Sequence, residues 1–196
     1  MTVGVQPKKR RTGSAEKILA AAAGLFHANG IRGVGMDQVI AESGVAKSTL
    51  YAHFPTRDAL IGAYLRSTDI SWRLQLRTAA EASGPDPQTQ LVGLFDALRG
   101  SFDRHGFFGC PFISAAVETA LDSEARALTI EHSRRRNEWL LELARRTGSK
   151  RPESLARQIG VLIDGALATG RLLQDARVID DAQEAAEALV RQHLSN

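Results

Sequence analysis

Apolar residues recur every three or four positions along most of the chain, a spacing that predicts amphipathic helices. The first predicted helix runs from Ser14 to about Asn29, with Ser14 as its N-cap and Gly30 as its stop. A long helix is predicted from Thr56 to near Ala82. Gly84, Pro85 and Pro87 interrupt the pattern, and Leu91, Leu94, Phe95, Leu98 and Phe102 then predict a helix that ends near Gly106. Further helices are predicted at about 111–120, 123–147, 152–170 and 180–193. No stretch alternates as a half-buried β-strand does, so the predicted fold class is all-α with about nine helices.

Residues 35–60 have the pattern of two short helices joined by a glycine turn, followed by the start of the long helix. Gly44 supplies the left-handed backbone conformation that a Cβ atom would strain. Apolar residues stand where two steeply crossing helices bury them, at Val39, Ile40, Val45, Leu50 and Phe54. The pattern predicts a helix-turn-helix. Its second helix keeps polar side chains suited to phosphate oxygens and base edges, namely Lys47, Ser48, Thr49, Tyr51 and His53.

This segment resembles the DNA-binding region of the TetR family of bacterial repressors. The matching residues are Val39, Ile40, Ser43, Gly44, Val45, Ala46, Lys47, Ser48, Thr49, Leu50, Tyr51, His53, Phe54 and Arg57. The resemblance extends over about residues 14–66, and beyond them it rests on the number and spacing of helices. Ala46 and Gly35 depart from the family pattern, because a hydroxyl residue usually caps a helix at each position. The alanine is expected to cost roughly 1 kcal/mol of capping.

Positive charge is concentrated in the first third of the chain. The net charge is +3, but residues 1–66 carry nine basic and four acidic side chains, and the remainder carries sixteen and eighteen. A polyanion is therefore the expected partner of the N-terminal part. Together with the helix-turn-helix, this predicts that the partner is double-stranded DNA, with a palindromic operator. We predict a mobile basic arm at 1–13, a helix-turn-helix domain at 14–56 and a ligand-binding and dimerisation domain at 57–196. Residues 57–82 of the latter form the connecting helix.

The predicted DNA contacts divide by position. Lys47, Ser48 and Thr49 lie near the N-terminal end of the second helix, which enters the major groove first, and are predicted to contact base edges and nearby phosphates. Arg57, at the start of the next helix, is predicted to add a charge-assisted phosphate contact. The family resemblance implies phosphate contacts for Tyr51 and His53. The alternatives are partial core packing for Tyr51 and an exposed or structural role for His53.

The last two predicted helices carry more apolar surface than one side of a small bundle needs, together with small residues that permit close backbone approach. The family resemblance implies that this pair forms a four-helix interface of a homodimer, and a two-fold dimer reads a palindrome. The predicted interface residues are Leu155, Ile159, Leu162, Ala166, Gly170, Ala182, Ala186 and Leu189. The alternative is that these residues pack inside the monomer.

Four of the seven phenylalanines lie within residues 102–112, which is typical of an apolar ligand pocket and also of an ordinary core. The family resemblance implies that this region borders an inducer cavity. The predicted ligand-binding residues are Trp72, Phe102, Phe108, Cys110, Phe112 and Trp139. Cys110 directly precedes a proline predicted to open a helix, where a positive helix end lowers a thiol pKa. Its segment also resembles part of the electrophile-responsive repressors of the same family, although the alternative is a small buried hydrophobe.

These patterns predict a DNA-binding transcriptional regulator, a repressor released from its operator by a small, largely apolar inducer. The alternative is an electrophile- or redox-sensing repressor that acts through Cys110. An enzyme is disfavoured because there is no glycine-rich phosphate loop or nucleophile elbow, and the least implausible version would pair Cys110 with His105. A non-specific architectural DNA binder is disfavoured by the large, nearly neutral C-terminal part. We expect no catalytic residue, cofactor or metal, no membrane span, and a cytoplasmic location.

Overall fold

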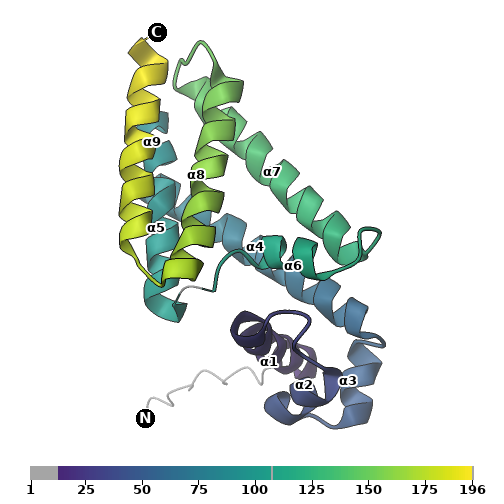
Figure 1. Cartoon of the computed structure of the whole chain (residues 1–196). Coiled ribbons are helices and arrows are strands. Elements are labelled where there is room, and N and C mark those ends of the chain that lie inside the picture. Colours follow the sequence, from purple (N-terminus) through teal and green to yellow (C-terminus); the bar gives the residue numbers. More distant parts are fainter. Residues whose placement is uncertain (1–12, 107, 196) are drawn as a thin grey trace, which may run out of the picture. The chain divides into compact units, whose positions relative to one another are not determined.

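The computed structural model describes residues 13–106 and 108–195, and this part of the chain forms nine α-helices (Figure 1). They are α1 (Ser14–Asn29), α2 (Met36–Ser43), α3 (Lys47–His53), α4 (Arg57–Ala82), α5 (Pro87–His105), α6 (Pro111–Glu118), α7 (Glu124–Arg146), α8 (Pro152–Leu173) and α9 (Arg177–Ser195). The described residues contain no strand, so the all-α prediction is confirmed. Apart from Gly13, the predicted basic arm lies outside the described residues.

Two helix starts differ from prediction. Gly13 rather than Ser14 is the N-cap of α1, and its own N–H donates to Glu16 Oε2 at 3.2 Å. The last helix begins at Arg177 rather than Asp180, because the Asp175 side chain accepts a hydrogen bond of 2.9 Å from the Arg177 N–H. The predicted stop of α1 at Gly30 is confirmed, with the Gly30 N–H donating to the carbonyl of Phe26.

The chain divides into two compact units, residues 1–64 and residues 65–196, with the division inside α4. In the first unit, α1, α2, α3 and the first turns of α4 bury one apolar core. Its members include Ile18, Ala22, Phe26, Ile31, Val34, Val39, Leu50, Phe54, Leu60, Ile61 and Tyr64. Gly44 has a φ of 66°, the left-handed turn expected between α2 and α3. The first unit therefore contains the predicted helix-turn-helix.

The second unit is a helical bundle. Helix α8 packs against both α7 and α9, α5 packs against α7 and α9, and α6 packs against α7 (Figure 1). Gly93 of α5 lies directly against Ser83, the residue after α4, because an added Cβ atom would lie 1.7 Å from Ser83 Oγ. Among the described residues, no helix is both long enough and apolar enough to span a bilayer.

Candidate DNA-binding surface and ligand grooves

Helix α3 has a buried apolar side and an exposed polar side. Leu50 is fully buried and Phe54, directly after the helix, is 8% exposed, so these two side chains fix α3 against the core. The polar side chains at 47, 48, 51 and 53 are exposed, while Thr49 is half-buried. Tyr51 is 39% exposed and therefore is not a core residue. The structure thus brings the residues predicted to contact DNA onto the open side of one short helix.

The start of α3 has no side-chain cap, as expected for Ala46. At the start of α2, Gly35 likewise offers no side-chain cap, although its own N–H donates to Gln38 Oε1 at 2.7 Å. Lys47 Nζ lies 3.4 Å from Asp37 Oδ1, and both side chains are mostly exposed. Surface ion pairs of this kind contribute little to stability, so the Lys47 ammonium is readily redirected to another anion.

Arg57 has a structural contact that the sequence did not predict. Its Nε donates to the Val34 carbonyl at 3.1 Å, and its Nη2 donates to the Ile31 carbonyl. The guanidinium therefore ties the start of α4 to the loop between α1 and α2. The predicted phosphate contact of Arg57 stays a prediction, and any such contact shares the guanidinium with these two carbonyls.

The structure buries most of the predicted interface residues inside the second unit, which agrees with the alternative that they pack within the monomer. A side chain enclosed by its own bundle has no surface to offer a second chain. These buried residues are Leu155, Ile159, Ala166, Gly170, Ala182 and Ala186. Leu162 and Leu189 are half-buried, and their interface role stays a prediction. The apolar and small residues that α8 does expose follow a different stripe, Val161, Gly165, Ala168 and Leu172.

Two adjoining grooves lie between α4 and α7. The first, of about 270 Å³, is lined by Arg73, Leu76, Arg77, His132, Arg135, Arg136, Glu138, Trp139 and Glu142. The second, of about 200 Å³, is lined by Leu65, Arg66, Asp69, Ile70, Arg73, Phe112, Leu128, Glu131, His132 and Arg135. Of the predicted ligand-binding residues, Trp139 lines the first groove and Phe112 the second. Trp72, Phe102, Phe108 and Cys110 line neither, and Trp72 and Phe102 pack against the core of the bundle.

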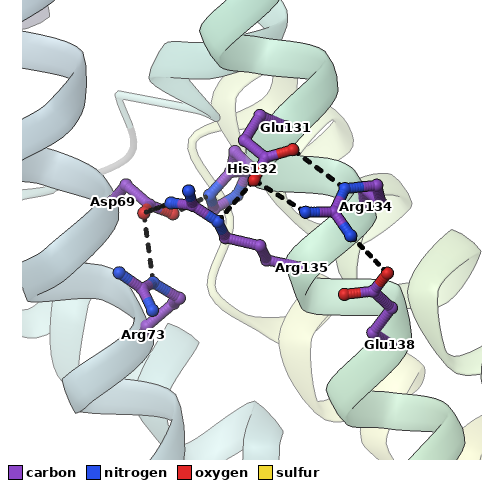
Figure 2. A network of polar contacts seen from close by, with 7 residues as sticks. All are labelled: Asp69, Arg73, Glu131, His132, Arg134, Arg135 and Glu138. Carbon is purple, nitrogen blue, oxygen red and sulfur yellow. Dashed lines mark hydrogen bonds and ion pairs between the residues drawn. The ribbon is translucent and has the colours of Figure 1, made fainter.

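Arg73, His132 and Arg135 line both grooves, and all three contact a buried carboxylate of the second groove, Asp69, which is 7% exposed. Figure 2 shows it on α4, facing three cationic or polar side chains. His132 Nδ1 lies 2.7 Å from Asp69 Oδ1, while Arg135 Nη1 and Arg73 Nε lie 3.3 and 3.1 Å from Oδ2. Burial lowers the pKa of His132 despite the opposing effect of the Asp69 carboxylate. A neutral imidazole with its proton on Nδ1 then donates a hydrogen bond to Asp69 Oδ1, which can only accept.

Helix α7 adds two further contacts around this carboxylate. The His132 ring stacks on Phe112 of α6, with ring centroids 3.7 Å apart and an interplanar angle of 3°. Arg136 is 7% exposed and holds Asp164 of α8 in a two-pronged ion pair, at 2.5 and 2.9 Å. Phe112 was among the predicted ligand-binding residues, but Asp69, His132 and Arg136 were not predicted from the sequence. The available signal was the run of three arginines at 134–136, because three consecutive residues of a packed helix cannot all face solvent.

Cys110 differs from the prediction of a reactive thiol. It is the N-cap residue of α6 and is half-buried. Burial raises the pKa of its thiol, and the backbone N–H groups of Ile113 and Phe112 oppose that effect without overcoming it. A raised pKa leaves the sulfur protonated and weakly nucleophilic. The predicted lowering of the thiol pKa is therefore wrong, and the redox alternative loses its support.

The described part of the chain has no cluster of side chains suited to hold a metal ion. No three His, Cys, Asp or Glu side chains within it are grouped to hold a metal ion. The side chain of His105, the suggested partner of Cys110, lies outside what the structure describes.

Known proteins match both the sequence and the fold. Residues 18–64, which span the helix-turn-helix, match the family of bacterial regulatory proteins named for tetR. The chain is 31% identical over 165 residues to the HTH-type transcriptional regulator LmrA of Bacillus subtilis (strain 168), covering 82% of this chain and 85% of LmrA. It is likewise 31% identical over 168 residues to YxaF, an uncharacterised HTH-type regulator of the same organism, covering 83% of this chain and 85% of YxaF.

The fold agrees with this relationship. The crystal structure of SCO4454, a TetR-family transcriptional regulator from Streptomyces coelicolor, superimposes with a TM-score of 0.85 and 30% sequence identity. That superposition covers 92% of this chain and 95% of SCO4454. The chain belongs to the TetR family of transcriptional regulators. It is a DNA-binding regulator of transcription with an N-terminal helix-turn-helix and a helical C-terminal domain.

Proposed function

We propose that the chain is a repressor that binds a palindromic operator as a homodimer and releases it when a small molecule occupies the second unit. The observation that carries the proposal is the exposed polar face of α3, with Lys47, Ser48 and Tyr51 standing away from the buried Leu50. One such helix reads only a few base pairs, and a two-fold dimer doubles the reading.

The outer stripe of α8 supports the homodimer. Val161 and Leu172 are 70% and 81% exposed, and Gly165 and Ala168 are exposed between them. These four residues recur at intervals of four, three and four along α8, the spacing of a seam between packed helices. Exposed apolar side chains in a continuous stripe are unfavourable in water, and a second copy of the chain would cover them. This stripe, rather than the buried residues of α8 and α9, is therefore the proposed dimer interface.

The two grooves between α4 and α7 support the ligand response. They lie in the second unit, apart from the helix-turn-helix residues, and both are lined by α4, the helix that begins in the first unit. A ligand that fits one position of α4 better than another shifts the population toward that position. Release of DNA then requires only that the favoured position match the operator poorly.

Gel-shift titrations test the DNA contacts. Lys47→Ala is expected to lose roughly 1–3 kcal/mol on the preferred palindrome and to discriminate less against altered half-sites, because the lysine reads a base edge. Tyr51→Phe removes a hydroxyl predicted to bind phosphate and should weaken all sequences similarly. Arg191→Ala removes an exposed charge of α9 and is the charge-matched control.

The outcomes separate the assignments. If Lys47→Ala and Tyr51→Phe lose affinity equally on every sequence, Lys47 is not a base reader. If Arg191→Ala loses as much as Lys47→Ala, the effect is one of net charge and the α3 surface is misassigned.

A further inference from the structure

The groove lined by α4 and α7 is strongly basic where an apolar cavity was predicted. We define the arginine groove as the 270 Å³ space lined by Arg73, Arg77, Arg135, Arg136, Leu76, Trp139, His132, Glu138 and Glu142. Four guanidinium groups face two carboxylates in it. Glu138 is already paired with Arg134, at 2.5 Å. Arg73 and Arg135 contact Asp69, Arg135 also pairs with Glu131 at 2.7 Å, and Arg136 pairs with Asp164. Among the described residues, Arg77 is the groove arginine that forms no ion pair with a carboxylate.

Two arginines of the groove also hold buried N–H groups without an acceptor. The Nη1 and Nη2 atoms of Arg136 bind Asp164, but its buried Nε has no hydrogen-bond partner. Arg73 Nε is close to Asp69 but makes no aligned hydrogen bond to it or to any other described atom. A buried charged donor without an acceptor is destabilising, and such an atom in a cavity wall indicates a missing acceptor.

The remainder of the groove is aromatic and aliphatic. Leu76 and Trp139 form its apolar wall, and the Arg77 guanidinium lies over the Trp139 ring, 5.5 Å from the centroid. A planar guanidinium on an indole face is a surface on which a flat ring stacks well. The volume of about 270 Å³ is at the lower end for small-molecule sites.

We propose that the arginine groove binds a small aromatic carboxylate. The carboxylate oxygens accept from Arg73 and Arg136, whose buried N–H groups lack acceptors, and the ring lies against Trp139 and Leu76. The proposal gives the chemical class of the ligand. Only the effect of ligand binding on DNA binding rests on the proposed function. Because Arg73 and Arg135 also contact Asp69, an incoming carboxylate competes with the side chain that joins α4 to α7.

Isothermal titration calorimetry of the full chain with 2-naphthoate tests the proposal. The control ligand is 2-naphthalenemethanol, which has the same ring but no charge. We expect one naphthoate per chain and at least about tenfold weaker binding of the alcohol, because the charge-assisted contacts are lost. The double variant Arg73→Gln with Arg77→Gln should lose at least about tenfold in naphthoate affinity. Arg145→Gln is the control, since Arg145 is an exposed arginine of α7 outside the groove.

Arg136 is left intact because its removal would strand Asp164 without its ion-pair partner. Trp139→Leu keeps an apolar wall and should weaken naphthoate binding by removing the stacking surface. The proposal fails if naphthoate does not bind, or if naphthoate and the alcohol bind equally well. It also fails if the double variant and Arg145→Gln lose the same naphthoate affinity. Thermal melts of every variant verify that the bundle remains folded.

A parallel titration on protein bound to its selected operator distinguishes this proposal from the function above. If naphthoate binds in the groove but does not displace DNA, the ligand class stands and the ligand-release function fails. If the protein binds a palindromic operator but does not bind naphthoate, the DNA-binding function stands and the ligand class fails.

Discussion

Arg57 shows how one side chain can take a role that its position in a motif does not reveal. The sequence places it at a helix start beside a DNA-binding helix, which favours a phosphate contact. The structure places its guanidinium on the carbonyls of Ile31 and Val34, which lie far from it in sequence. No local pattern signals that contact, because it depends on how the α1–α2 loop folds back.

We therefore expect Arg57→Ala to lower the free energy of unfolding of the DNA-binding unit by about 2–3 kcal/mol, since two charge-assisted hydrogen bonds are lost and two carbonyls lose their donor. Urea denaturation followed by circular dichroism measures this. Arg66→Ala, which removes an exposed arginine paired with Glu124, should change stability little. Unchanged stability of Arg57→Ala, together with a weaker salt dependence of DNA binding, would favour the phosphate role instead.

His132 is the residue whose charge state the fold constrains most. Burial lowers its pKa below the ordinary value of 6.5, so it is neutral when folded, whereas the unfolded chain takes up a proton there as the pH falls through that value. Stability is therefore lost as the pH falls below about 6.5, by at most about 1.4 kcal/mol per pH unit for one proton. His193, whose pKa is also lowered by burial and by Arg151, contributes in the same direction.

Denaturant titrations between pH 7.5 and 5.5 should show this loss in the wild type and a shallower slope in His132→Phe, which keeps a ring to stack on Phe112 but has no titrating group. The comparison concerns the slope, because the variant also loses the hydrogen bond to Asp69. His53→Gln, at an exposed site on α3, is the control. A slope that His132→Phe leaves unchanged would show that other groups cause the acid sensitivity.

At the level of the helices, sequence periodicity predicted existence and order well but not which face meets which neighbour. Pro111 and Pro152 opened helices where expected, and Gly30 and Gly44 ended them. In α8, however, both sides carry small or apolar residues, so spacing alone could not separate the face that packs on α7 and α9 from the outer stripe.

The outer stripe of α8 gives a test of dimerisation. Ala168→Glu should place a charge in the proposed seam and give monomers at micromolar concentration, whereas the wild type is expected to be a dimer in light scattering. Ala127→Glu, on the exposed side of α7, is the matched control. A monomeric wild type, or a dimer that survives Ala168→Glu unchanged, would contradict the proposed seam.

For the whole molecule, the sequence predicted the helix-turn-helix and the division of charge, and misplaced the chemistry of the second unit. The motif of α2 and α3 is local, so its glycine turn and its buried Leu50 could be identified from spacing. The groove is built from α4 and α7, which are separated by two helices in the chain, and its arginines resemble an ordinary charged helix face when read in sequence. The cluster of phenylalanines at 102–112 predicted a ligand pocket in that segment. Of the phenylalanines predicted to bind ligand, only Phe112 lines one of the two grooves.

The uncapped start of α3 has a consequence for the thermodynamics of binding. Ala46 offers no side-chain oxygen, so the N–H groups at the first turn of the recognition helix depend on solvent in the free protein. A phosphate oxygen placed there would accept from first-turn N–H groups that have no side-chain acceptor in the free protein. Because the helix is already formed, these hydrogen bonds would add to the enthalpy of DNA binding without an entropic cost of ordering α3.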